Sequence, residues 1–262
     1  MISSIREGLI NLIAIIRKLD RKVLIIFLSV AILQTISWYF TSRRFFAENL
    51  FDYFSKSQNV DLYQYIYWFV GDFASFFILP ILIIVIFLKD KPKNFGLQVG
   101  DYKTGLKISF YFILIMIIVS WFISSSSAFQ ETYPLLRRTR ESWHLFFIYE
   151  SGLILYLFAW EFIWRGFMLF GLEEKFGYYA VLIQMIPFVI LHNGKPFMET
   201  FGAIFGGIAL GILAFRTRSI IYCVIVHIGI MFIIDLFSVL RYRAADFGIG
   251  VNSFINILKI IF

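Results

Sequence analysis

Residues 144–170 read HLFFIYESGLILYLFAWEFIWRGFMLF and form the most informative stretch of this 262-residue sequence. The run is long enough to cross a bilayer as a helix, which takes about 20 mostly apolar residues. Glu150, Glu161 and Arg165 lie within it. Because a charge in hydrocarbon is costly, such residues usually face the interior of a helix bundle and mark functional sites. The stretch therefore predicts a membrane helix that carries part of a buried polar site.

The composition of the whole chain is that of a membrane protein. Hydrophobic residues make up 60% and charged residues 16%, and the mean hydropathy is +0.81, far from the balance of a soluble domain. The formal charge of +7 lies in short runs between apolar segments, which indicates membrane orientation and no nucleic acid partner. A single cysteine, Cys223, excludes a disulfide framework and a multi-cysteine metal site.

Seven apolar stretches are predicted to cross the membrane, and an eighth is shorter. The runs are continuous rather than alternating, which favours helices over a β-barrel. The predicted fold class is therefore all-α, a polytopic bundle of about seven or eight transmembrane helices. The stretches cover residues 23–40, 63–88, 106–129, 144–170, 178–192, 200–215 and 219–240, and the short one covers 247–262.

The chain is predicted to form one bundle preceded by a surface segment. Residues 1–22 carry apolar residues at helical spacing against Arg6, Arg17 and Lys18, typical of a helix on an anionic membrane surface. They lack the cleavage site of a signal peptide. Residues 23–262 make the transmembrane bundle. The distribution of Lys and Arg among the loops favours a cytoplasmic N-terminus.

Three distant stretches place ionisable side chains at similar depth. Glu161 and Arg165 are four residues apart and lie on one helix face, close enough for an ion pair. Counting 1.5 Å per residue from the helix ends places Glu161, His192 and His227 at depths of roughly 14 to 21 Å. Two imidazoles and a carboxylate can hold a water-activating metal, or activate water directly with the carboxylate as base. The alternative is that these residues only fix helix packing.

Further residues near these positions are open to two interpretations. Glu199 is a second candidate base, because the Asn-Gly-Lys-Pro turn before it can fold it back towards His192. A glutamate favoured by the dipole at a helix N-terminus is the alternative. Cys223 is more readily explained as a buried, inert thiol than as a nucleophile. Glycines at small spacing in the sixth stretch predict close helix packing, and they are Gly202, Gly206, Gly207 and Gly211.

Three short motifs give these positions a family resemblance. Residues 160–165 read WEFIWR, residues 188–192 read FVILH, and His227 opens a third motif. They resemble the patterns E-E-x-x-x-R, F-x-x-x-H and H-x-x-x-[ND] of the CPBP family, the CAAX-processing and bacteriocin-processing intramembrane proteases. The resemblance covers a core at about 144–240, and residues 95–105, FGLQVGDYKTG, look like the loop that leads into it.

Two positions depart from the family patterns. Trp160 stands where the family has its first glutamate, which is regarded as the base that activates water. Met231 stands where Asn or Asp is expected, and Asp235, two helical turns beyond His227, is a partial substitute. Together with residues 192–219 these features resemble a prokaryotic subgroup with Trp or Tyr before the glutamate.

The resemblance implies an intramembrane endopeptidase that hydrolyses a peptide bond in a membrane-associated protein or peptide. Glu161 or Glu199 is then the base, His192 and His227 bind metal or water, and Arg165 holds Glu161 or the oxyanion. A divalent metal such as zinc on His192, His227 and Glu161 belongs to the metal-dependent alternative. The implied surroundings are membrane lipid and a prokaryotic cytoplasmic (inner) membrane. The rival functions are a non-catalytic scaffold, favoured by Trp160 and Met231, and a transporter.

Overall fold

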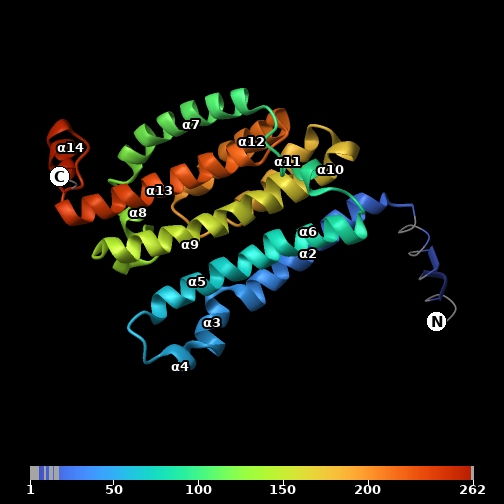
Figure 1. Cartoon of the computed structure of the whole chain (residues 1–262), viewed down its shortest axis with the longest axis horizontal. Helices are drawn as coiled ribbons and strands as arrows, with labels where there is room; N and C mark the ends of the chain where they lie inside the picture. The colour runs from blue at the N-terminus through green and yellow to red at the C-terminus, as the bar shows by residue number, and fades with distance from the viewer. Residues whose placement is uncertain (1–5, 9, 12–13, 15–17, 261–262) are drawn as a thin grey trace.

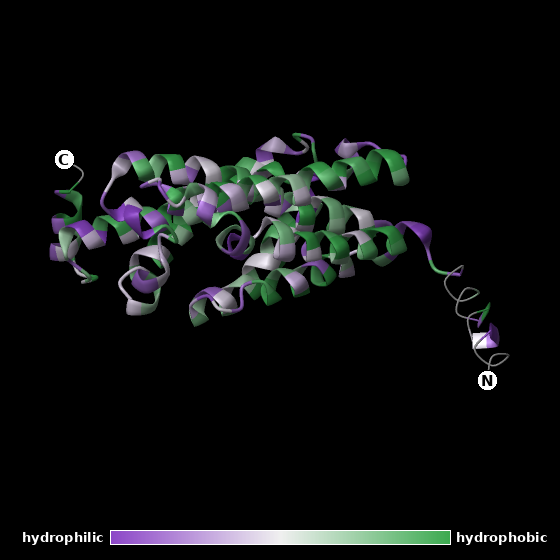
Figure 2. Ribbon diagram, turned by 90° about the horizontal axis from the view of Figure 1, so that it is seen from below, coloured by the Kyte–Doolittle hydropathy of each residue, from purple (hydrophilic) through white to green (hydrophobic). Residues whose placement is uncertain are grey.

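The computed structural model describes residues 6–8, 10–11, 14 and 18–260, and the regular structure in these residues is helical throughout (Figure 1). The predicted all-α class is confirmed. Half of the surface segment predicted over residues 1–22 lies outside the described residues. Hydrophobic residues run along the long helices, and hydrophilic residues concentrate in the connections (Figure 2).

Six helical segments in the described part are long and apolar enough to cross a membrane, close to the predicted seven or eight. The chain is a multi-pass membrane protein. The segments are Arg21–Asn49, Val60–Phe87, Tyr102–Ile123, Trp143–Phe176, Phe197–Thr217 and Ile221–Ala244.

Two predicted spans are shorter in the structure than in the prediction. The helix α11 covers Tyr179–Ile190, which at 1.5 Å per residue is about 18 Å, less than the hydrocarbon thickness of about 30 Å. Turns flank α11 on both sides, at residues 177–178 and 191–194. The helix α14 covers only Val251–Leu258. Hydropathy detects apolar character, whereas the turns set the helix length.

The remaining elements are given in chain order. The first half comprises α2 (Arg21–Ile36), the π-helix η1 (Ser37–Thr41), α3 (Arg43–Asn49), α4 (Phe51–Phe54), α5 (Val60–Phe73), the π-helix η2 (Ala74–Ile78), α6 (Leu79–Leu82), the π-helix η3 (Ile83–Phe87), the 3₁₀ helix η4 (Pro92–Phe95) and α7 (Tyr102–Ile123). The second half comprises α8 (Ser127–Thr132), the 3₁₀ helix η5 (Arg137–Arg140), α9 (Trp143–Glu161), the π-helix η6 (Phe162–Met168), α10 (Leu169–Phe176), α12 (Phe197–Thr217) and α13 (Ile221–Ala244).

Side-chain caps fix where three of these helices begin. The Asp20 carboxylate accepts a hydrogen bond from the Val23 amide at the start of α2, and Asp101 does the same for α7. The Ser142 hydroxyl accepts from the amide two positions after the first residue of α9. Such caps satisfy backbone donors that have no partner inside the helix.

The helix α9 occupies the middle of the bundle. In Figure 1 it lies between α2, α5 and α6 on one side and α7, α12 and α13 on the other. Its continuation into η6 and α10 is the most deeply buried of the candidate spans. Side chains on this segment therefore face protein rather than lipid, which is where ionisable groups are tolerated.

The loop that precedes α7 is fixed against the turn between α12 and α13. The Ile220 amide donates to the Gly96 carbonyl at 3.0 Å, and the Asp101 amide donates to the Thr217 carbonyl at 2.9 Å. Gly100 has φ +58°, and a Cβ there would lie 2.0 Å from the Thr217 carbonyl oxygen. Only glycine allows this close approach, so the loop locks the start of α13 in place.

Candidate active site

The buried pair Glu161 and Arg165 lies where α9 changes into the π-helix η6. All seven residues of η6 are buried. Single-turn π segments are frequent at functional sites, because the extra residue re-aims the side chains around it. Arg165 Nη1 lies 3.1 Å from Glu161 Oε1, and neither side chain is exposed. The pair that the spacing predicts is present.

His227 on α13 completes this cluster. Its Nδ1 lies 2.6 Å from the same Glu161 Oε1 that contacts Arg165, and its side chain is 13% exposed. The second carboxylate oxygen, Glu161 Oε2, is buried and has no hydrogen-bond partner among the described residues. Glu161 Oε1 thus contacts both Arg165 and His227, whereas Oε2 contacts no hydrogen-bond donor of the described residues.

Phe188 on α11 connects His192 to the cluster. Its ring centroid lies 4.0 Å from Arg165 Cζ, a cation–π contact, and 4.5 Å from the centroid of the His192 ring. The ring of His227 lies 6.3 Å away. His192 Nδ1 lies 2.7 Å from the Phe188 carbonyl oxygen. Three sequence motifs therefore meet around one phenylalanine ring.

Both histidines use Nδ1 for an acceptor on the protein. With a proton on Nδ1, each imidazole donates to that acceptor and keeps the lone pair of Nε2 free, an arrangement set by the hydrogen bonds. A buried carboxylate that accepts from Nδ1 also stabilises the imidazolium form when Nε2 takes a proton. The geometry suits His227 to a base and Glu161 to its support.

A divalent metal ion is the alternative partner for these donors. Outer hydrogen bonds to a carboxylate and a carbonyl are typical of metal-binding histidines. A catalytic zinc, however, takes three protein ligands, and within the described residues no group of three His, Cys, Asp or Glu side chains is placed to hold a metal ion. Among the described residues, the donors of His192, His227 and Glu161 therefore do not fit the metal site that the sequence suggests for them.

Glu199, the second candidate base, belongs to a different cluster. It lies in the first turn of α12, and its Oε1 accepts a 2.6 Å hydrogen bond from the Tyr133 hydroxyl. Lys195 Nζ donates to the same hydroxyl at 2.8 Å and lies 3.8 Å from Glu199 Oε1. Burial, reinforced by the negative charge of Glu199, raises the pKa of Tyr133 well above its ordinary value. Tyr133 was missed by sequence reasoning, since no spacing relates it to a residue 66 positions away.

The other polar residues of the spans occupy separate positions. Asp235 on α13 faces Glu150 on α9, and both Asp235 oxygens are buried without a hydrogen-bond partner in the described part of the chain. Met231 lies between His227 and Asp235 at helical spacing and packs on apolar side chains. Position 231 therefore carries an apolar side chain, and Asp235 does not supply a polar group there.

Cys223 packs against a neighbouring helix, and so do two of the four glycines for which close packing is predicted. Cys223 is buried, and its Sγ lies 3.1 Å from the Leu210 carbonyl oxygen. A Cβ on Gly207 or Gly211 would lie within 3 Å of side chains on α11, as close packing requires. At Gly202 and Gly206 no atom of the described residues lies within 4 Å of such an atom, so the packing predicted for these two glycines is not present there.

Trp160 fills the position at which the resembled family carries its first glutamate. The indole is 8% exposed and packs against Tyr156, Phe76 and Phe188 at ring-centroid distances of 5.6 to 6.2 Å. The position therefore contributes aromatic surface, and Glu161 is the carboxylate nearest to it in sequence.

The helices that carry this cluster lie in a part of the chain that matches a known family. Residues 141–233 match the family model described as type II CAAX prenyl endopeptidase Rce1-like. This stretch is similar to an Rce1-like domain. The domain contains α9, η6, α10 and α11 and extends into α13, so it includes Glu161, Arg165, His192 and His227. Neither the curated proteins nor the solved structures gave a match.

Proposed function

We propose that the protein is an intramembrane endopeptidase in which a Glu161–His227 pair activates water. The observation that carries the proposal is the 2.6 Å contact between His227 Nδ1 and Glu161 Oε1, buried beside Arg165 within a domain similar to a protease family. The base is His227 in this mechanism. Glu161 holds the imidazole, which differs from the role of base that the sequence suggests for it.

The reaction begins with a water molecule at Nε2 of His227. The imidazole takes a proton as the water oxygen attacks the carbonyl carbon of the peptide bond, and the Glu161 carboxylate stabilises the imidazolium that forms. The imidazolium then gives the proton to the leaving amine. Arg165 keeps Glu161 ionised, since an arginine guanidinium stays charged. His192, whose Nε2 lone pair is also free, is a candidate acceptor of a hydrogen bond from the attacking water.

The substrate class follows from the family description. The description of the matched family names a CAAX prenyl endopeptidase. A prenylated peptide with a C-terminal C-a-a-X sequence is therefore the first substrate to test. A prokaryotic cytoplasmic membrane is part of the proposal. So is a cytoplasmic N-terminus, which the distribution of Lys and Arg supports.

The test uses the purified full-length protein in detergent with a farnesylated CAAX-motif peptide and an unprenylated copy. We expect release of the C-terminal tripeptide from the farnesylated peptide, and loss of release in His227→Ala with an unchanged thermal midpoint. Equal release by wild type and His227→Ala would rule out this site. Absence of release from any membrane peptide, together with complementation of a deletion strain by His227→Ala, would favour the scaffold function that Trp160 suggests.

A further inference from the structure

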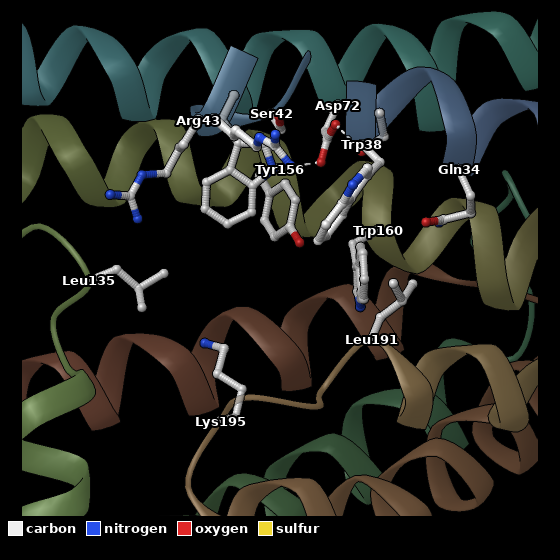
Figure 3. Close-up of a pocket in the computed structure, with 13 residues that line it drawn as sticks. Gln34, Trp38, Ser42, Arg43, Asp72, Leu135, Tyr156, Trp160, Leu191 and Lys195 are labelled. Carbon is white, nitrogen blue, oxygen red and sulfur yellow. Dashed lines mark hydrogen bonds between the residues drawn. The ribbon is translucent and has the colours of Figure 1, made fainter. Parts of the chain in front are cut away.

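A cavity lies beside the candidate active site, between the N-terminal helices and the connection from α11 to α12 (Figure 3). Its volume is about 390 Å³, within the range of small-molecule sites, which is roughly 300 to 1,000 Å³. Trp160 and Leu191, the sequence neighbours of Glu161 and His192, form part of its wall. The cavity therefore adjoins the Rce1-like domain and includes residues from outside it.

The wall of the cavity changes in character from one end to the other. In Figure 3, Arg43 lies towards one end and Trp160 and Gln34 lie towards the other. Four aromatic side chains line the space between these ends: Trp38, Trp68, Tyr156 and Trp160. The chain runs from Gln34 in α2 through Trp38 in η1 to Arg43 at the start of α3. The cationic end therefore lies near a helix terminus, and the aromatic end lies deeper in the bundle.

The charges around the cavity favour an anion at the Arg43 end. The carboxylate of Asp72 already accepts from Ser37, Thr41 and Trp68 at 2.7 Å each. Among the cations of the wall, Arg44 pairs with Glu48 and Lys195 with Glu199.

Arg43 is the cation of the wall that forms no ion pair with any carboxylate in the described residues. Its guanidinium lies 3.9 Å over the ring of Tyr65, and its Nε is buried without a hydrogen-bond partner. A half-buried guanidinium of this kind gains most from a phosphate, to which it can donate two parallel hydrogen bonds.

The cavity is open towards the surface that faces lipid. Trp38 is 61% exposed and Leu191 is 36% exposed, and both also line the cavity. Tyr39 and Phe40, which follow Trp38 in the same candidate span, are exposed as well, so a molecule that enters beside Trp38 comes from the bilayer. We propose that the cavity binds an anionic phospholipid, with one acyl chain along the aromatic wall and the phosphate on Arg43.

The experiment measures tryptophan fluorescence of the full chain in detergent with phospholipids brominated on the acyl chain. Bromine quenches nearby indoles, and it reaches the buried Trp160 through the cavity. We expect brominated phosphatidylglycerol to quench more than brominated phosphatidylcholine, and this difference to be lost when Trp38, Trp68 and Trp160, the tryptophans of the cavity wall, are all replaced by Phe. Arg43→Gln should weaken phosphatidylglycerol binding about tenfold, the value of one charge-assisted contact.

The matched control is Lys56→Gln, which removes the same charge from an exposed residue on the same side of the bundle, outside the cavity wall. It should bind as wild type does. Equal quenching by the two lipids, equal losses in Arg43→Gln and Lys56→Gln, or a difference that survives when all three tryptophans of the cavity wall are replaced by Phe would overturn the proposal.

A second measurement needs no variant, should Arg43→Gln fail to fold. Unlabelled phosphatidylglycerol should displace the brominated lipid from the wild-type protein, and phosphatidylcholine should not. Displacement by an acidic peptide with no effect of phosphatidylglycerol would assign the cavity to a peptide and overturn the lipid proposal. His227→Ala should keep the lipid preference, so this test is independent of hydrolysis.

Discussion

Nδ1 of His227 lies 2.6 Å from Oε1 of Glu161, although the two residues are 66 positions apart in the chain. Arg165 contacts the same oxygen from the helix that carries Glu161. An imidazole held in this way has one defined tautomer and a charged group that stabilises its protonated form. In the proposed mechanism this contact makes His227 the base and Glu161 its support, whereas the sequence indicates only that the two residues belong to one site.

The first prediction separates the two candidate carboxylates. Glu161→Gln keeps the size of the side chain and a hydrogen-bond acceptor for His227 but loses the charge that stabilises the imidazolium. We expect kcat for the farnesylated peptide to fall by about 10²- to 10⁴-fold with little change in KM. Glu199→Gln, in the separate Tyr133 cluster, should keep most of the rate. The reverse order would identify Glu199 as the functional carboxylate.

The second prediction concerns the buried ion pair. Arg165→Met leaves the Glu161 charge buried without its guanidinium and should cost about 3 to 5 kcal/mol of stability. The thermal midpoint in detergent reports this loss. In a Glu161→Gln background the same substitution should cost clearly less, because no carboxylate charge is left unpaired. Additive losses in the double variant would show that Arg165 acts independently of Glu161.

The third prediction concerns metal dependence. Since the described donors do not supply three metal ligands, we expect the processing rate to survive dialysis against a chelator, with substoichiometric zinc by elemental analysis. Loss of the rate on chelation and its return with added zinc would instead establish a metal on His192 and His227.

The fourth prediction uses two glycines of α12 as a matched pair. A Cβ on Gly211 would lie 2.8 Å from Gln184 Nε2 and from Val181 Cγ1, whereas none of the surrounding atoms lies within 4 Å at Gly202. Gly211→Ala should therefore lower stability by about 1 to 3 kcal/mol through overpacking. Gly202→Ala should be neutral or slightly stabilising, since alanine is the better helix former. Equal thermal midpoints for the two variants would contradict this packing of α11 on α12.

The fifth prediction tests the role of Asp72 in joining α5 to η1. Asp72→Asn retains one acceptor oxygen for three donors, from Ser37, Thr41 and Trp68. Loss of these charge-assisted hydrogen bonds should cost about 1 to 3 kcal/mol. Asp52→Asn, at an exposed position of α4, is the control and should leave the thermal midpoint unchanged. A midpoint unaffected by Asp72→Asn would mean that the two elements pack without this carboxylate.

The sequence by itself determined the solvent and the class of the fold. Long apolar runs allow only helices in a bilayer, because every backbone polar group must be satisfied inside the segment. The contact between Glu161 and Arg165 also followed from spacing alone, since residues four apart share a helix face. Local rules of this kind need no knowledge of the partner helices.

Only the tertiary structure decided which distant residues meet. Similar depth grouped His192 with His227, but depth does not define direction around a helix, and the packing of α13 on α9 placed His227 against Glu161. The same packing took Glu199 to Tyr133 instead. The tertiary structure likewise decided where α11 ends and which glycines of α12 have a neighbouring helix beside them. Sequence spacing fixes a face of one helix, and the choice of its neighbour depends on the packing of the whole bundle.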